Sequence, residues 1–423
     1  MRFTISLKCC GILFGFLVSF CTVVSATEVT DTGTELTLKQ ALTLSLAHNP
    51  QLYQYRFTRE ALEAEKETSA LRPSLALELD LENFAGSGET KGLDTAETTL
   101  ALSSVIELGD KRKARMSYAG ARLDKAVWEQ QAVTLDVLGK ITQFFIETLA
   151  TQANIQLAEE SQALSQSLYK TVKARSFRGA APEAEVMRAK AALVRAEVRL
   201  TALKKKLERN KVNLAIFWGE TNPRFHSLAG ELFRFKTSES FEELYARVQN
   251  SPALEVLASE ARLQDAQVTL ARTSGRSDLS WRAGVRRFEE TGDSAFVVGL
   301  SMPLFSGKRN TGEVKAALAN RNAVNYAKQH LLLRLRAQLF DAHSLREQSL
   351  AEVNSIQTIA IPALEKALRL TRKAYENGRY RYLDLIAAQE DLLERKQALI
   401  DAATTVHVSQ ALIERLSSEP LQP

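Results

Sequence analysis

Two rows of apolar residues, each repeating every seven positions, organise the chain. One row follows a turn at residues 177–179, and the other follows a turn at residues 375–379. The first row is Val186, Leu193, Leu200, Leu207 and Leu214, and the second is Leu385, Leu392, Leu399, Val406 and Ile413. The rows are offset by 199 positions throughout, as are the turn glycines. A seven-residue apolar repeat is typical of helices that pack along a seam. We therefore interpret the chain as an internal duplication, with one long helical hairpin in each half.

Long, almost proline-free segments precede both turns. Residues 109–175 contain no proline, and residues 309–375 contain only Pro362. At about 1.5 Å per residue, a helix of roughly 65 residues is about 100 Å long. We expect returning helices at 183–217 and 381–417, helices of intermediate length at 50–71 and 252–275, and a short helix that starts at Leu36 and ends at Asn49. Each long helix would then lie beside two shorter ones.

Four segments change to a period of two, which indicates β-strands. The clearest begins at Leu75, where leucines alternate with Ala76, Glu78, Asp80 and Glu82. Weaker alternation follows at 99–106, 279–286 and 295–302, with glycine-bearing turns between the members of each pair. The sequence therefore predicts two β-hairpins of four strands in all.

A strand with leucine on one face and carboxylates on the other has two interpretations. It is an ordinary soluble hairpin with one face on a core, or a membrane strand with leucine towards lipid. A sheet in lipid has to close on itself, because open edges leave backbone groups unsatisfied. Four strands cannot close, so several copies would combine. Two copies give eight strands and a filled interior, whereas three give twelve strands and a lumen.

The predicted organisation is two structural repeats joined by an irregular equatorial linker. We expect a signal peptide at 1–26, a first repeat at 27–217 with its β-hairpin at 74–107 and its helical hairpin at 109–217, a linker at 218–240, a second repeat at 241–418 with its β-hairpin at 278–304 and its helical hairpin at 308–418, and a C-terminal tail at 419–423.

The start of the chain has the features of an export signal. Arg2 and Lys8 precede a short apolar core, and small residues end the segment at position 26. A retained N-terminal anchor is the alternative. The chain has 3 cysteines, all before residue 26, so we expect a mature protein without disulfides, thiol catalysis or Cys-bound metal. Lipidation at Cys21 is disfavoured because the bulky Phe20 precedes it.

Charge and composition exclude several classes of protein. Without Arg2 and Lys8, the 55 Lys and Arg become 53 against 50 Asp and Glu, a net charge of +3. That balance is too even to indicate nucleic-acid binding. Few aromatic residues and abundant Ala, Leu, Glu and Arg suit long helices. No apolar stretch after residue 26 is long enough for a transmembrane helix.

The order of these elements resembles the TolC-type outer-membrane efflux proteins. The resemblance is carried by the tandem halves, the hairpins, the glycine-tipped turns and the opening LTLKQALTLSLAHNPQL at 36–52. Residues 106–115 and 285–293 are most similar to the CzcC branch, whose members serve heavy-metal efflux pumps. The segment that follows Pro303 departs from the form typical of that branch.

The resemblance implies a mainly α fold with a membrane β portion. Three chains would form a homotrimer in which four strands per chain make a 12-stranded β-barrel, continued by a 12-helix α-barrel across the periplasm. It implies an outer-membrane location and contact with outer-membrane lipid. It also implies two protein partners, a periplasmic adaptor (a membrane fusion protein) and an inner-membrane pump of the resistance-nodulation-division class. Nucleic acid is not an expected partner.

The candidate functional residues lie at the helical tips. Glu185 and Asp384 each follow the turn glycine, Gly179 or Gly378, by six positions, just inside the returning helix. Carboxylates in a first helical turn also favour the helix dipole, which is the purely structural interpretation. In three copies they would form rings of carboxylates, which attract cations at a narrow mouth. In the family that this chain resembles, the position of Asp384 is an aspartate at the periplasmic constriction.

The turns themselves are the candidate docking sites for the adaptor. They comprise Arg178 and Gly179 in the first half and Asn377, Gly378, Arg379, Tyr380 and Arg381 in the second. The structural alternative is that both are only helix-terminating turns, in which glycine supplies a positive φ. Some relatives carry a gating arginine at the position of Tyr380, so the family's locking contacts do not transfer directly.

Catalytic and metal chemistry are not expected. The 5 histidines are scattered, and none has a partner three or four positions away on a helix. We find no nucleophile arrangement and no phosphate-binding loop, so we expect neither an enzyme nor a cofactor. The sequence leaves three functions open: a duct for divalent heavy-metal cations, a TolC-like exit duct for drugs or type I secreted proteins, and a soluble periplasmic coiled-coil adaptor.

Overall fold

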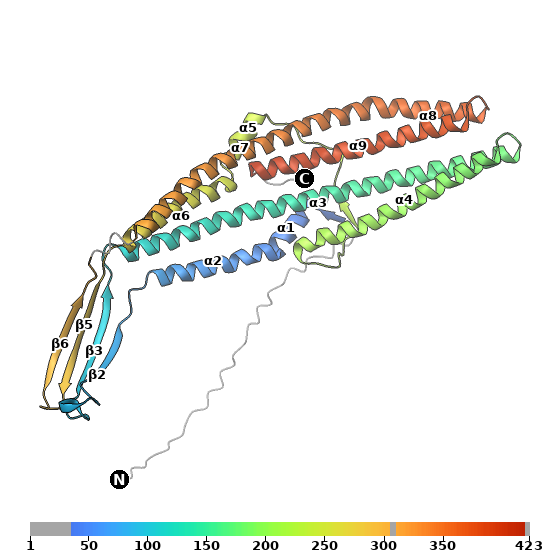
Figure 1. Ribbon diagram of the computed structural model, residues 1–423. Helices are drawn as coiled ribbons and strands as arrows, with labels where there is room; N and C mark the ends of the chain where they lie inside the picture. The colour runs from blue at the N-terminus through green and yellow to red at the C-terminus, as the bar shows by residue number, and fades with distance from the viewer. Residues whose placement is uncertain (1–34, 305–309, 419–423) are drawn as a thin grey trace, which may run out of the picture.

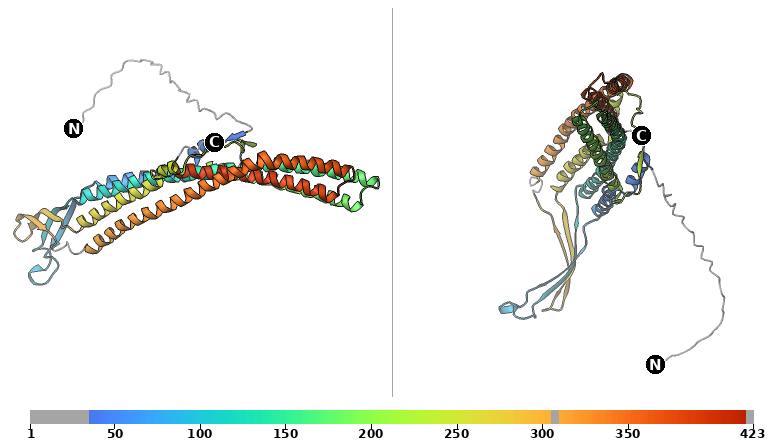
Figure 2. Two further views of the ribbon diagram at one scale, coloured as in Figure 1. Left: turned by 90° about the horizontal axis from the view of Figure 1, so that it is seen from above. Right: turned by 90° about the vertical axis from the view of Figure 1, so that its right-hand side faces the viewer.

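The computed structural model describes residues 35–304 and 310–418, and in it the chain forms a long rod of helices with a small sheet at one end (Figure 1). The predicted signal peptide, the C-terminal tail and residues 305–309 lie outside the described residues. The two turns that connect the helices of each hairpin lie at the end of the rod opposite the sheet (Figure 2). Among the described helices, none is both long enough and apolar enough to cross a bilayer.

Two continuous helical paths run the length of the rod. The first is α3 (Lys111–Phe177), whose 67 residues span about 100 Å. The second consists of α7 (Thr311–Ser355), a π-helical turn (Ile356–Ala360) and α8 (Ile361–Glu376). The predicted second rod is therefore present, but it is not a plain α-helix throughout.

The π turn lies immediately before Pro362. Proline lacks an N–H group and its ring crowds the preceding turn, so an α-helical hydrogen bond is lost there. The chain takes up an extra residue instead, and the Ile361 N–H donates to the carbonyl of Ile356.

Shorter helices complete both halves of the rod. On the side of the sheet these are α2 (Pro50–Ser69) and α6 (Pro252–Ser274), which pack on α3, and α6 also packs on α7. On the side of the turns they are α4 (Glu183–Ala215) and α9 (Tyr382–Ser417). Helix α9 packs on α3, α7 and α8, so the two halves of the chain share one wall.

The sheet contains four antiparallel strands in the order β2–β3–β5–β6. The strands are β2 (Ala76–Glu82), β3 (Glu97–Ile106), β5 (Leu279–Phe288) and β6 (Ser294–Ser301), with the short 3-10 helix η1 (Gly88–Thr90) in the loop between the first two. Both predicted hairpins form, and β3 pairs with β5 to join them. This order leaves β2 and β6 as open edges.

One face of this sheet is apolar and exposed. The register aligns Leu79 with Leu100 and Leu100 with Val285, so apolar side chains continue across the strands. Leu79 is 69% exposed and Phe296 on β6 is 91% exposed. The strands project beyond the helices, as Figure 1 shows.

The middle of the rod differs from the prediction. Leu36 does not start a helix: Glu35–Thr37 form strand β1, which pairs in parallel with β4 (Ser227–Ala229), and α1 runs from Leu38 to His48. The predicted irregular linker therefore contains a strand, and the 3-10 helix η2 (Ile216–Trp218) ends at its first residue. Three-residue strands are too short to give a detectable period. Thr37 instead caps α1, where its hydroxyl accepts from the Gln40 N–H at 3.3 Å.

Side chains of the long helices hold the linker in place ahead of α5 (Phe241–Val248). Arg346 on α7, which is 2% exposed, donates to the Lys236 carbonyl at 2.7 Å. His407 on α9 contacts the Leu232 carbonyl at 2.9 Å, and burial lowers the pKa of this imidazole. Glu414 pairs with the Lys236 ammonium at 2.9 Å. The linker is therefore a fixed part of the wall.

Candidate functional site

Two tight turns close the helical hairpins at the end of the rod opposite the sheet. In the first, the Ala180 N–H donates to the Arg175 carbonyl at 2.9 Å. In the second, the Arg379 N–H donates to the Ala374 carbonyl at 2.9 Å. These six-to-one bonds define a Schellman motif, which requires a left-handed residue. Gly179 and Gly378 supply it with φ values of 74° and 73°. Both predicted turn glycines thus occupy equivalent positions.

The two tips share one apolar core within a single chain. Tyr375 at the end of α8 and Tyr382 at the start of α9 are each 2% exposed. They pack in a cluster with residues of all four helices: Leu168, Val172, Val186, Ala189, Leu368, Leu385 and Leu392. Because this core joins both hairpins, the position of one tip depends on the other.

Arg175 bridges the two tips through backbone carbonyls. Its Nη1 donates to the carbonyls of Tyr375 at 2.5 Å and Glu376 at 3.0 Å, and its Nη2 donates to the Ala180 carbonyl at 3.3 Å. The carbonyls at a helix C-terminus have no partner within the helix, and a cation there also favours the helix dipole. The guanidinium lies 4.6 Å from the centre of the Tyr375 ring. Arg175 therefore fastens the end of α8 to the first hairpin.

Tyr375 makes the second link between the tips. Its hydroxyl donates to the Glu185 carboxylate at 3.4 Å, across 190 positions of sequence. Burial, with the adjacent Glu185 charge, raises the pKa of Tyr375 to about 12. The hydroxyl accordingly keeps its proton at neutral pH and acts as a donor. Glu185 lies in the first turn of α4 as predicted, and its side chain is half-buried against this tyrosine.

Asp384 occupies the matching first turn of α9 but makes different contacts. Its carboxylate accepts from the Arg381 N–H at 2.9 Å and lies 3.7 Å from the Arg381 guanidinium. This contact caps the helix, whereas the structural role considered from the sequence was only an interaction with the helix dipole. Asp384 is half-buried and, like Glu185, lies at the extreme end of the rod. The structure does not bring the two carboxylates into contact within one chain.

The remaining predicted tip residues are largely exposed. Asn377 and Arg379 are exposed, Tyr380 is 52% exposed, and the Arg381 side chain is 83% exposed. Arg178 bonds back to its own helix through the Ala174 carbonyl at 3.3 Å.

An open groove of about 760 Å³ lies beside the first turn, between α3 and α4. Phe177, which is 94% exposed, and Met187, which is 53% exposed, form its apolar part. Lys170, Lys173 and Arg178 form a mainly basic border, and Glu183 is the single acidic residue in the lining. This combination suits a partner surface that carries both apolar and acidic groups.

The two heptad rows lie along the helix seams. All ten members are buried or half-buried, and Leu214, Val406 and Ile413 are buried most completely. On α9, Tyr382 and Gln389 lie three residues before Leu385 and Leu392 and are also buried. That spacing is the second position of a coiled-coil repeat. It is the signal by which Tyr382 could have been found from the sequence.

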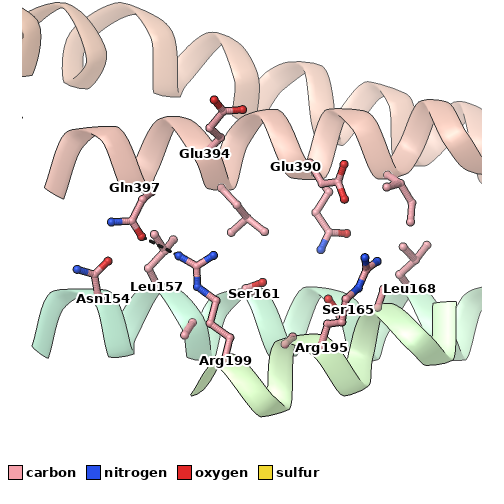
Figure 3. Close-up of a pocket in the computed structure, with 16 residues that line it drawn as sticks. Asn154, Leu157, Ser161, Ser165, Leu168, Arg195, Arg199, Glu390, Glu394 and Gln397 are labelled. Atoms are coloured by element: carbon pink, nitrogen blue, oxygen red, sulfur yellow. Dashed lines mark hydrogen bonds between the residues drawn. The ribbon is translucent and has the colours of Figure 1, made fainter. Parts of the chain in front are cut away.

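A second cavity of about 420 Å³ lies between α3, α4 and α9 (Figure 3). Arg195 and Arg199 enter it from α4, and Arg199 donates to the Gln397 side chain at 3.1 Å. Ser161 and Ser165 line the side formed by α3. The lining also contains two carboxylates, Glu390 and Glu394, and no histidine. Within the described ranges, no three His, Cys, Asp or Glu residues gather as a metal site.

Sequence reasoning missed Arg175 and assigned Tyr375 only to the turn. Both act through partners about 200 positions away, and no periodic pattern reports such a contact. Phe177 was likewise treated as part of a turn, and its side chain is 94% exposed.

Comparisons with known proteins agree with this architecture. Residues 41–220 and 244–417 match the family model described as outer membrane efflux protein. The chain is 24% identical to the cobalt-zinc-cadmium resistance protein CzcC of Cupriavidus metallidurans, covering 95% of this chain and 97% of the relative. It is 26% identical to the nickel and cobalt resistance protein CnrC of the same organism, over 64% of this chain and 63% of the relative. A crystal structure of CusC superposes with a TM-score of 0.77 at 16% identity, covering 90% of this chain and 92% of that one.

Proposed function

The chain belongs to the outer membrane efflux protein family, and from that premise we propose that it is the outer-membrane channel subunit of a tripartite exporter. In this role it conducts cargo passively from the periplasm to the exterior. The observation that carries the proposal is the combination of two features. An apolar sheet face is exposed at one end of the rod, and two helical tips are packed against each other at the other end.

The sheet supports a membrane location. Side chains such as Leu79 and Phe296 are exposed on one face, whereas the opposite face carries ion pairs. This is the division expected of a barrel strand between lipid and a watery lumen. Strands β2 and β6 have open edges, which are not tolerated in hydrocarbon. Three chains, each giving four strands, would close a 12-stranded barrel with a lumen, and the helices would continue it as a 12-helix barrel.

The tips support gating at the periplasmic end. Arg175 and the Tyr375–Glu185 contact tie the second hairpin to the first, so breaking them would free α8 and α9 to move outwards. In a trimer, Glu185 and Asp384 would give six carboxylates around the mouth. Such a ring attracts cations and repels anions.

The exposed turn residues support docking of a periplasmic adaptor. Phe177 and Met187 offer apolar surface, and Lys170, Lys173 and Arg178 surround it with positive charge. An adaptor whose own tip carries apolar and acidic residues would fit both features. The exposed Arg379 and Tyr380 extend this surface onto the second hairpin.

Divalent heavy-metal cations are the proposed cargo, delivered by an inner-membrane pump of the resistance-nodulation-division class. The support is the similarity to relatives named for cobalt, zinc, cadmium and nickel resistance. Within the described residues the chain offers no metal cluster, which is compatible with a duct that releases its cargo. Drugs or type I secreted proteins are the other cargo classes that this fold can carry.

Gene deletion tests the proposed function. Loss of this chain should lower tolerance to zinc, cobalt, cadmium or nickel, and expression of the intact chain should restore it. The restored protein should fractionate with the outer membrane as an oligomer. Unchanged metal tolerance together with lost drug tolerance or secretion would show that the channel carries drugs or proteins instead of metal cations. Recovery in the soluble periplasm would contradict a channel altogether and favour a coiled-coil adaptor.

A further inference from the structure

The polar face of the sheet carries carboxylates and arginines in a fixed arrangement. Two arginines of β5 meet four carboxylates of the first hairpin; the residues are Arg282, Arg286, Glu78, Asp80, Glu82 and Glu97. The register puts all six on one face, opposite the exposed leucines. Four carboxylates against two guanidinium groups leave this face with a net charge of −2 per chain.

The arginines reach over a complete strand to pair with the three carboxylates of β2, whereas Glu97 is on the intervening strand β3. Strand β3 lies between β2 and β5, so partners on β2 and β5 are separated by two strand spacings, roughly 10 Å. The residues of β3 under the arginines are small, and Thr99 and Ala101 are 0% and 2% exposed. Gly284 is required beside them, because a Cβ there would lie 2.4 Å from the Leu100 carbonyl oxygen. The sequence thus leaves room for two arginine bridges.

Arg286 separates two carboxylates that would otherwise repel each other. Glu82 and Glu97 are directly opposite in the β2–β3 register, where side chains are neighbours and like charges destabilise the pair. One Arg286 nitrogen lies 2.9 Å from the Glu82 carboxylate and another lies 2.7 Å from the Glu97 carboxylate. Asn83 donates to the other Glu97 oxygen at 2.8 Å.

Arg282, four residues before Arg286 on β5, makes an equivalent bridge. Its guanidinium pairs with Asp80, and its Nε lies 3.4 Å from the Glu78 carboxylate. The other Glu78 oxygen accepts from the Ser103 hydroxyl at 2.5 Å. All four carboxylates therefore have a guanidinium partner.

We propose that Arg282 and Arg286 are selectivity-determining residues of the channel, because they prevent its carboxylates from retaining divalent cations. The inference rests on the proposed function, in which this face lines the lumen. Divalent metals bind carboxylate oxygens, and two opposite carboxylates such as Glu82 and Glu97 are a ready pair of ligands. With the guanidinium groups in place, the residual negative charge attracts cations while the oxygens stay occupied. Cations then pass without being held.

Zinc titration of single channels tests this inference. Removing the Arg286 charge with Arg286→Gln releases Glu82 and Glu97 and should create a zinc-binding lumen. We expect the zinc concentration that halves the current to fall by about tenfold or more relative to the wild type, into the range of weak carboxylate sites. Arg287→Gln is the matched control, because Arg287 is on the same strand but pairs with its neighbour Glu289 at 2.9 Å on the opposite face.

Further variants make the result specific. Arg286→Gln combined with Glu97→Gln removes one of the two ligands and should return zinc block to the wild-type level. Arg282→Gln is an independent second variant that releases Glu78 and Asp80, should Arg286→Gln assemble poorly. Zinc binding to the detergent-solubilised protein, measured by titration calorimetry, reports the new site without requiring conduction.

The outcomes separate this inference from the function on which it rests. If the wild type conducts and neither arginine variant gains zinc block or zinc binding, the arginines do not control retention and the inference is wrong. If the wild type forms no channel, the proposed function fails, whatever zinc does to the variants. If both arginine variants and the Arg287 control gain block equally, a general change in charge is responsible and the inference is again wrong.

Discussion

A single hydroxyl group, that of Tyr375, links the two hairpin tips through the Glu185 carboxylate. Its ring is packed in the shared tip core and lies under the Arg175 guanidinium. Two polar contacts and one apolar cluster thus hold the two tips against each other. In our account the tips are the moving part of the channel, so weakening one contact should shift the balance towards opening without unfolding the rod.

Tyr375→Phe removes the hydroxyl and keeps the ring. A hydrogen bond of this kind contributes about 1 kcal/mol, so the open fraction should rise about fivefold if the bond exists only in the closed state. Single-channel recording measures this fraction directly. Tyr326→Phe is the matched control, since Tyr326 is 73% exposed on α7. Equal open fractions in wild type and Tyr375→Phe would show that the contact does not hold the gate.

Alkaline pH should release the same contact. The pKa of Tyr375 is raised to about 12, mainly by burial and then by the Glu185 charge. A raised pKa stabilises the packed state below the ordinary tyrosine value of 10, and this contribution is lost as the pH rises through about 12. Channel opening should therefore increase between pH 10 and 12, with a smaller increase in Tyr375→Phe. An ultraviolet titration in which both proteins ionise identically would contradict the assignment.

The sequence indicated where the tips are, but not how they are joined. Gly179, Gly378, Glu185 and Asp384 were located by counting from the duplicated heptads, because turns and first helical turns are local features. Arg175 could not be assigned, because its partners are carbonyl groups about 200 positions away. A contact between backbone oxygens and a distant side chain leaves no mark on hydrophobic periodicity.

The glycine turns determine where each hairpin reverses. Gly378 has a φ of 73°, a conformation that costs other residues about 1 kcal/mol or more. Gly378→Ala should therefore destabilise the second tip and increase protease cleavage there. Gly120→Ala is the control, because Gly120 lies inside α3 with open space around it, where alanine favours the helix. Equal protease resistance of the two variants would exclude a conformational role for Gly378.

Long periodic elements were predicted better than short ones. The rods, the returning helices and both β-hairpins follow from periods of seven and two over many residues. The pair β1–β4 was missed because three residues carry no period, and Leu36 was assigned to a helix in consequence. The π turn before Pro362 was also missed, since proline indicates a disturbance but not its form. The cross-strand arginine bridges depend on register, which the sequence left undetermined.

The whole molecule is polarised from end to end. Its strands expose leucine and phenylalanine at one end, and its tips expose Phe177 and several basic residues at the other. Two continuous helical paths connect these ends without a break in the wall. That polarity is what a duct between lipid and a periplasmic partner requires, and the fixed linker makes the rod one unit.

Reversal-potential measurement in planar bilayers is the decisive test of a cation-conducting channel with the tip carboxylates at its mouth. The purified wild type, recorded across a potassium chloride gradient, should form channels that prefer cations. Glu185→Gln with Asp384→Asn should weaken that preference, because both neutralised groups lie at the proposed mouth. Glu183→Gln, which changes an exposed residue in the same first turn of α4, should leave it unaltered. Absence of channels from the wild type, or a reversal potential that is identical in all three proteins, would contradict the account.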